Sequence, residues 1–211
     1  MSKCVIVGGA LIENYSFVRG HIKKDDFVIY CDCGLLHMEK LGAWPSLIVG
    51  DFDSHENPHL DVETITLPTE KDDTDTVYAV KEGMSRGFTD FLIVGALGKR
   101  FDHTLGNLAI LMMLESKGLT GMIVDDYSEI VVISGRENTT YKVSDDCKYF
   151  SILAAGGDAG GVTIKNAKYN ITDADIITDF PLGVSNEVPK GNTAEISIRE
   201  GRAFLIKVYT E

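Results

Sequence analysis

Six short runs, most of them continuously apolar and rich in β-branched residues, follow one another through the first 124 residues. They span 4–10, 27–32, 46–50, 64–67, 91–96 and 120–124. Runs that are apolar at consecutive positions are typical of strands buried on both faces of a parallel sheet. The first part of the chain is therefore predicted to be built on such strands.

Helical spacing separates several of these runs. One predicted helix covers 35–41 and stops at Gly42, the residue type that commonly ends helices. A second runs from Val77 to Gly87, and a third follows His103, with apolar residues three and four positions apart. This alternation of strands and helices predicts a parallel α/β sheet.

The pattern changes at about Glu129. Strand-like runs now follow each other across turns rich in glycine or asparagine, at 130–133, 140–143, 149–153, 162–164, 194–198 and 203–209. This spacing is typical of an antiparallel β-sandwich or barrel. The prediction is an α/β N-terminal domain with a mainly parallel sheet, residues 1–126, followed by an all-β sandwich C-terminal domain, residues 127–211.

Composition narrows the class of protein. The 211 residues, 44% of them hydrophobic, suffice for sizeable cores. The formal charge of −12 argues against nucleic acid and anionic membranes as partners, and a polyanionic substrate would need metal ions beside it. No apolar run approaches the ~18 residues of a membrane span, and the first run is too short for a signal peptide, so we expect a cytoplasmic protein.

Two carboxylates follow the third strand. Asp51 and Asp53 are two residues apart, so on an extended chain they point the same way. Ligands of open α/β sheets bind beyond the carboxyl ends of the strands, which is where this pair lies. The pair suggests a site for a hard cation, and an acidic strand-to-loop turn is the plain alternative.

Further acidic residues are predicted to face the same crevice. They are Asp32 after the second strand, Asp72, Asp73 and Asp75 at a helix start, and Asp102 after the fifth strand. Carboxylates at a helix start also cap free amides, which explains one or two of them structurally. Two unit charges about 4 Å apart repel by roughly 4 kcal/mol near a protein surface. A divalent ion removes this penalty, and oxygen ligands favour Mg²⁺ or Mn²⁺ over zinc.

The cationic half of the predicted site is the turn Gly98-Lys99-Arg100. Glycine lets the backbone approach a ligand, and Arg100 can bind phosphate oxygens with two hydrogen bonds. Lys71 is a second candidate phosphate contact. His103 and Asn107 lie one helical turn apart and either line the pocket or act as ordinary capping and surface residues.

Together these motifs resemble the thiamine pyrophosphokinase family. The segments that carry the resemblance are Asp32-Cys33-Gly34, Gly50-Asp51-Phe52-Asp53-Ser54, Lys71-Asp72-Asp73-Thr74-Asp75 with Ala79, Gly98-Lys99-Arg100-Phe101-Asp102-His103 with Asn107, and Leu182-Gly183-Val184-Ser185-Asn186-Glu187. Two departures are a lysine at position 99, where the family often has glycine, and Cys33, where a small residue is common.

The resemblance implies a reaction and an assembly. The reaction is Mg²⁺-dependent transfer of the pyrophosphoryl group of ATP to the hydroxyl of thiamine, giving thiamine diphosphate and AMP. The N-terminal domain would bind ATP and metal, and the β-sandwich would bind thiamine. The assembly would be a homodimer with active sites between subunits.

Residue roles follow from the matched positions. Mg²⁺ would lie on Asp51, Asp53 and Asp75, and Arg100 would bind the phosphates. Asp72 or Asp102 would orient or deprotonate the attacking hydroxyl. Ser185 and Asn186 would contact thiamine. The remaining ATP contacts would be Asp32, Lys71, Gly98, Lys99, His103 and Asn107.

Two other functions compete with this one. A strand that ends in Asp-x-Asp is also the nucleophile signature of haloacid-dehalogenase-like phosphatases, in which Asp51 would be phosphorylated and Asp53 would be the acid. The phosphatase hypothesis does not explain the Lys71 and Arg100 segments, and Ser54 departs from the phosphatase motif. The other possibility is a nucleotide- or thiamine-binding sensor without turnover.

Overall fold

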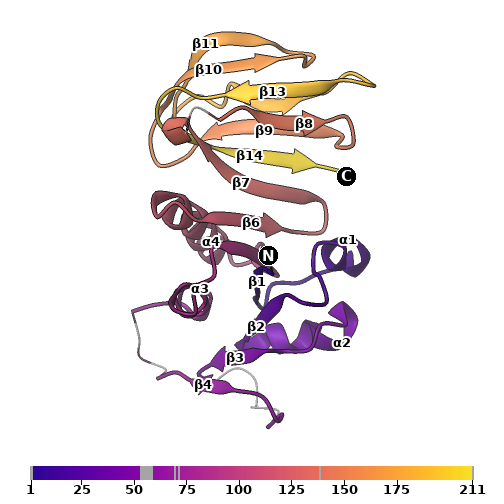
Figure 1. Cartoon of the computed structure of the whole chain (residues 1–211), viewed down its shortest axis with the longest axis vertical. Coiled ribbons are helices and arrows are strands. Elements are labelled where there is room, and N and C mark those ends of the chain that lie inside the picture. Colours follow the sequence, from indigo (N-terminus) through magenta and orange to yellow (C-terminus); the bar gives the residue numbers. More distant parts are fainter. Residues whose placement is uncertain (1, 53–58, 69, 71, 138, 211) are drawn as a thin grey trace. The chain divides into compact units, whose positions relative to one another are not determined.

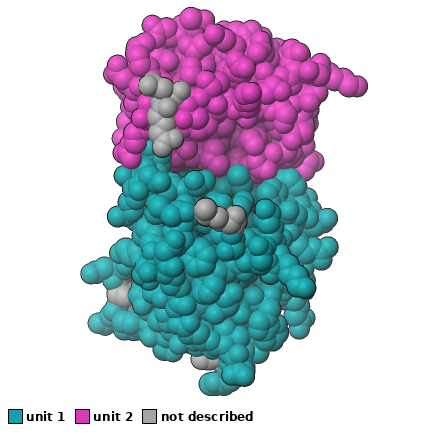
Figure 2. Space-filling model, viewed as in Figure 1, with its two compact units in different colours: residues 1–126 teal, residues 127–211 magenta. Residues whose placement is uncertain are grey.

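A computed structural model describes residues 2–52, 59–68, 70, 72–137 and 139–210 of the chain. The chain forms two compact units, Met1–Asp126 and Tyr127–Glu211, called unit 1 and unit 2 (Figure 2).

Unit 1 is built on a parallel β-sheet (Figure 1). Its strands are β1 (Cys4–Val7), β2 (Phe27–Cys31), β3 (Leu47–Gly50), β4 (Thr64–Thr66), β5 (Asp90–Val94) and β6 (Thr120–Val124). They lie in the order β4-β3-β2-β1-β5-β6, and each neighbouring pair is parallel. The predicted mainly parallel sheet is confirmed.

Helices connect these strands. They are α1 (Tyr15–Arg19), the 3-10 helix η1 (Asp32–His37), α2 (Met38–Leu41), α3 (Asp75–Ser85) and α4 (Phe101–Ser116). The helix predicted over 35–41 is thus a 3-10 turn followed by one α-helical turn, and it ends as expected at Gly42, which has a left-handed φ of 64°. Within the described part of the chain, no helix combines the length and the apolar character needed to cross a membrane.

The sheet reverses its winding direction at β1. From β1 the chain passes to β2 on one side, and it later reaches β5 on the other side. The loops that follow β1 and β5 therefore leave the sheet in opposite directions, which opens a crevice at the carboxyl ends of these two strands.

Helix α3 packs closely on the centre of the sheet at Gly83. A Cβ atom at this position would lie 2.8 Å from Sγ of Cys4 and 2.8 Å from Cε1 of Phe91. All of β1 is buried, as the continuous apolar run predicted. The absence of a side chain at Gly83 is what lets the helix approach the sheet.

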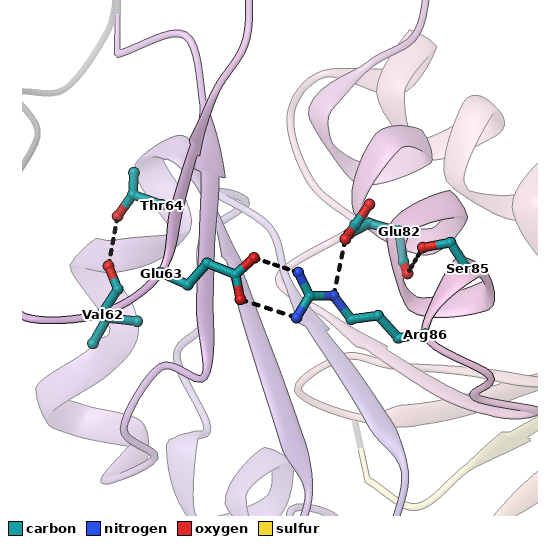
Figure 3. Close-up of polar contacts among 6 residues, drawn as sticks. All are labelled: Val62, Glu63, Thr64, Glu82, Ser85 and Arg86. Atoms are coloured by element: carbon teal, nitrogen blue, oxygen red, sulfur yellow. Dashed lines mark hydrogen bonds and ion pairs between the residues drawn. The ribbon is translucent and has the colours of Figure 1, made fainter.

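Arg86 joins the end of α3 to the start of β4 (Figure 3). Its Nη1 and Nη2 atoms donate to the carboxylate of Glu63 at 3.0 and 2.5 Å, and its Nε donates to Glu82 at 2.9 Å. The guanidinium also lies over the ring of Phe27. The hydrogen bonds from Arg86 lower the pKa of Glu63, so this pairing persists over the neutral pH range.

Unit 2 consists of two packed antiparallel sheets. Its elements are β7 (Ser128–Ser134), the 3-10 turn η2 (Gly135–Glu137), β8 (Tyr141–Ser144), β9 (Tyr149–Ala154), β10 (Ala159–Lys165), β11 (Ile171–Ile176), β12 (Gly183–Asn186), β13 (Thr193–Ser197) and β14 (Arg202–Val208). The sheet orders are β12-β9-β14-β7 and β11-β10-β13-β8.

One hydrophobic core joins the two sheets of unit 2. Phe150 and Leu205 come from one sheet, and Val162 and Ile196 come from the other. Because both sheets bury one face against this shared core, the unit is a sandwich. The predicted sandwich class is confirmed, and the barrel alternative is wrong.

We predict opposite effects of alanine at two helical glycines. At the exposed Gly106 of α4, where no atom lies within 4 Å of a Cβ, alanine should stabilise the protein by about 0.5–1 kcal/mol through helix propensity. At Gly83 the added methyl should clash with Cys4 and Phe91, and overpacking costs about 1–3 kcal/mol, so Gly83→Ala should destabilise. Thermal unfolding of both variants measures this. A higher melting temperature for Gly83→Ala would contradict the packing described.

Candidate functional site

A cavity of about 450 Å³ lies in unit 1. Its walls come from five segments: the turn after β1, the junction of β2 and η1, the start of α3, the turn after β5, and the start of α4. The turns after β1 and β5 place it at the point where the winding direction of the sheet changes, which is where open α/β sheets bind their ligands.

Glycines bring backbone close to backbone in this wall. The amide of Gly8 donates to the carbonyl of Val94, and the amide of Ala10 donates to the carbonyl of Gly95, both at 2.9 Å. A Cβ atom at Gly8 would lie only 2.5 Å from the carbonyl oxygen of Gly95. Gly8, Gly9, Ala10 and Gly95 were not predicted as site residues, although glycines at the ends of two strands were a usable signal.

Two of the predicted carboxylates line the cavity. Asp32 opens η1 with a left-handed φ of 39°, and Asp75 opens α3. The N-cap of α3 is Thr74, whose hydroxyl accepts from the amide of Val77 at 3.3 Å. The junction of β2 with η1 and the helix start thus bring these two carboxylates into one cavity.

The carboxylate of Asp32 has an oxygen atom that could bind a cation. Its Oδ2 atom accepts a hydrogen bond from the thiol of Cys33 at 3.3 Å, while its buried Oδ1 atom has no hydrogen-bond partner among the described residues. A buried carboxylate oxygen without a donor is unfavourable, and a divalent cation with substrate phosphates would supply the missing interaction. No group of three or more His, Cys, Asp or Glu side chains in the described ranges is arranged to hold a metal alone.

The other predicted acidic residues lie elsewhere. Asp51 follows β3 and is half-buried, and Asp72 is exposed; neither is part of the cavity wall. Asp53 and Lys71 lie outside the described residues. Metal binding by Asp51, Asp53 and Asp75 therefore stays a prediction.

The predicted cationic turn lines the cavity. Gly98, Lys99 and Arg100 all belong to its wall. The guanidinium of Arg100 donates two hydrogen bonds to the carboxylate of Asp102, at 3.0 and 2.6 Å, and both side chains are exposed. These hydrogen bonds hold the pKa of Asp102 well below its usual range, which makes this carboxylate a weak base. Asp102 itself does not line the cavity.

His103 and Asn107 lie on α4, and both line the cavity. The buried amide of Asn107 donates from Nδ2 to the carbonyl of Ala96 at 2.7 Å. The hydroxyl of Thr104 accepts from the amide of Gly98 at 3.2 Å. Asn107 and Thr104 thus fix the loop between β5 and α4, and Thr104 was not predicted as a site residue.

In unit 2, the predicted thiamine contacts Ser185 and Asn186 differ in environment. Ser185 is exposed, with a left-handed φ of 57°, and its amide donates to Oγ of Ser151 at 3.0 Å. Asn186 is buried, accepts from the amide of Tyr169 at 3.0 Å and donates to its carbonyl at 2.8 Å. Asn186 therefore holds the backbone that presents Ser185.

Comparison with known protein families covers both units. The family "Thiamin pyrophosphokinase, catalytic domain" matches residues 18–123, and "Thiamin pyrophosphokinase, vitamin B1 binding domain" matches residues 138–202. The chain belongs to the thiamin pyrophosphokinase family. The family and the thiamine diphosphokinase class of enzyme predicted from the sequence are confirmed.

Two named members of the thiamin pyrophosphokinase family share about a quarter of their aligned residues with this chain. The thiamine pyrophosphokinase of Bacillus subtilis (strain 168) is 25% identical over 189 residues, which cover 87% of this chain and 88% of that protein. Thiamin pyrophosphokinase 1 of Caenorhabditis elegans is 23% identical over 187 residues, with coverage of 84% and 75%.

Solved structures of the family share the fold. The crystal structure of Thiamine pyrophosphokinase from Bacillus subtilis has a TM-score of 0.86 at 22% identity, with full coverage of both chains. That of Thiamin pyrophosphokinase from Geobacillus thermodenitrificans has a TM-score of 0.82 at 25% identity, with coverage of 99% and 98%.

We predict that Asn107→Ala destabilises the protein by about 1–3 kcal/mol, because the buried carbonyl of Ala96 loses its donor. The exposed Asn192 provides a control, and Asn192→Ala should stay within about 0.5 kcal/mol of the unsubstituted protein. Urea unfolding measures both variants. Equal stabilities would show that Asn107 does not hold the loop between β5 and α4.

Proposed function

We propose that this protein transfers the pyrophosphoryl group of ATP to the hydroxyl of thiamine, giving thiamine diphosphate and AMP. The observation that carries the proposal is the match of the catalytic and vitamin B1 binding families to the two units. The two curated relatives described above align over most of their own length and most of this chain, and both are named as thiamine pyrophosphokinases. No activity of phosphatase type is suggested by these matches.

The cavity of unit 1 suits the polyphosphate of a nucleotide. Transfer at phosphorus depends on positioning and on charge neutralisation more than on covalent catalysis. Gly8 and Gly95 line the cavity without side chains, and Lys99 and Arg100 supply positive charge at the start of α4. The free amides at the start of this long helix add to that positive potential. In this proposal Arg100 exchanges Asp102 for phosphate oxygens.

We assign Mg²⁺ to the acidic side of the same cavity. Asp32 and Asp75 offer oxygen ligands there, and the unpartnered Oδ1 of Asp32 supports a cation. The family resemblance also implies Asp51 and Asp53 as Mg²⁺ ligands; Asp51 follows β3 outside the cavity wall. Mg²⁺ typically uses one or two carboxylates together with substrate phosphates, and when bound it would neutralise phosphate charge.

Thiamine would bind to unit 2 at the Ser185-Asn186 segment. Ser185 is exposed beside Val184, and Phe180 and Leu182 are also exposed just before β12. An apolar surface with a hydroxyl suits an aromatic ligand with a polar edge. The vitamin B1 binding family spans this segment, which supports the assignment.

We also propose a homodimer with active sites between subunits. Phe101 and Leu105 are exposed one helical turn apart on α4, in the first two turns after the cationic turn of the cavity. A second copy that covers these apolar side chains would lie beside that turn.

The first test combines the purified protein with thiamine, ATP and Mg²⁺ and follows the products by mass spectrometry, with and without EDTA. We expect AMP and thiamine diphosphate in a ratio of one to one, formed only in the sample without EDTA. Release of ADP or phosphate without thiamine diphosphate would contradict the proposal. Tight binding of thiamine or ATP without any product would favour the sensor function.

Two neighbouring aspartates provide a matched test of the acidic side. Asp75 lines the cavity, whereas Asp73 forms an ion pair with Lys81 at 2.6 Å and does not line it. Asp75→Asn should lower kcat/KM by about 100-fold or more, since a carboxylate ligand of the ion that would neutralise the phosphates is lost. Asp73→Asn should stay within about threefold, because exposed ion pairs contribute little. Steady-state kinetics at several Mg²⁺ concentrations measures both, and equal losses would refute the role of Asp75.

A further inference from the structure

His37 is a buried histidine with both ring nitrogens in hydrogen bonds. It ends η1; Nε2 lies 3.0 Å from the carbonyl oxygen of Ala10, and Nδ1 lies 2.7 Å from the hydroxyl of Tyr15. A carbonyl oxygen only accepts hydrogen bonds, so Nε2 carries a proton and donates it to Ala10. Burial lowers the pKa of His37, so the ring is neutral and Nδ1 accepts from Tyr15.

Ala10, the residue that His37 contacts, connects three segments of the cavity wall. Its amide donates to the carbonyl of Gly95 at 2.9 Å, and its carbonyl accepts from His37. A Cβ atom at Gly98 would lie 3.1 Å from Cβ of Ala10. The position of Ala10 therefore sets the distance between the turns after β1 and β5 and the cationic turn.

The two ends of η1 both contact the turn after β1. At the first end, a Cβ atom at Gly9 would lie 2.7 Å from Cβ of Cys33, which lines the cavity. At the second end, His37 donates to Ala10. The turn is thus held between the start of η1 and its final residue, and the contact at His37 is a directional hydrogen bond from a side chain.

We propose that His37 is a positioning residue for the polyphosphate of the nucleotide, acting through the carbonyl of Ala10. The proposal rests on the proposed function, because it takes the cavity of unit 1 as the nucleotide site. An apolar residue of similar size would fill the same space without donating. Such a residue would allow Ala10 to shift, and the Gly95 and Gly98 segments would lose their spacing around the phosphates.

The test uses His37→Leu, His37→Gln and His21→Leu. Leucine fills the space without a donor, whereas the side-chain amide of glutamine can replace Nε2–H. His21 is the matched control, since its Nδ1 atom also bonds a backbone carbonyl, that of Phe17 at 2.9 Å, and Phe17 does not line the cavity, whereas Ala10 does. His37→Leu should raise KM for ATP about tenfold, the loss expected for one hydrogen bond, with KM for thiamine and kcat within about twofold. His37→Gln should recover to within about threefold, and His21→Leu should not change KM for ATP.

Calorimetric binding of Mg·ATP separates this proposal from the proposed function. If the unsubstituted protein binds no nucleotide, the proposed function fails. If it binds and His37→Leu binds equally well, the role of His37 is overturned. An equal rise in KM for both substrates, or no recovery in His37→Gln, would also overturn it.

A spectroscopic readout covers the case in which His37→Leu does not fold. Nitrogen-15 NMR of the unsubstituted protein at neutral pH should show the neutral Nε2–H tautomer at His37. Tyr15→Phe should retain this ring proton at Nε2 and keep KM for ATP within about threefold, because the bond to Ala10 remains. An Nδ1–H tautomer in the unsubstituted protein would refute the proposed contact, because Nε2 would then have no proton to donate to Ala10.

Discussion

The close approach of the backbone after β1 to the backbone after β5 is the constraint on which the cavity depends. Two hydrogen bonds of 2.9 Å join these turns, from Gly8 to Val94 and from Ala10 to Gly95. Any side chain at Gly8 would meet the carbonyl of Gly95 and push the turns apart. The reversal of winding at β1 opens the crevice. Gly8 and Gly95 have no side chains, so the two turns can approach each other closely in its wall.

Charge is divided across this crevice. Asp32 and Asp75 line the cavity with negative charge, and Lys99 and Arg100 line it with positive charge. In a chain with a net charge of −12, a phosphate ligand is otherwise repelled, so the local separation of charge matters more than the total. The pairing of Arg100 with Asp102 keeps the guanidinium at the start of α4. The buried amide of Asn107 holds the loop that carries Lys99 and Arg100, and the imidazole of His37 holds the turn after β1.

In unit 2, too, one buried polar side chain holds the backbone while its neighbour is exposed. The side chain of Asn186 forms hydrogen bonds with the backbone of Tyr169. Ser185 beside it is exposed and has a left-handed conformation. A polar pair that is adjacent in sequence thus has two physical roles. The thiamine contact proposed for this segment would fall mainly on Ser185.

The sequence by itself determined the parallel sheet and the sandwich and predicted several residues that line the cavity of unit 1, because apolar periodicity records which positions are buried, and strand ends mark the carboxyl edge. Asp32, Asp75 and the Gly98–Arg100 turn were predicted in this way. Strands β11 and β12 were missed, since these edge strands are short or mostly polar and depend on a partner strand. Only the tertiary structure decided that Ala10, Gly95 and His37 meet, because hydrogen bonds between segments far apart in the chain leave no period in the sequence.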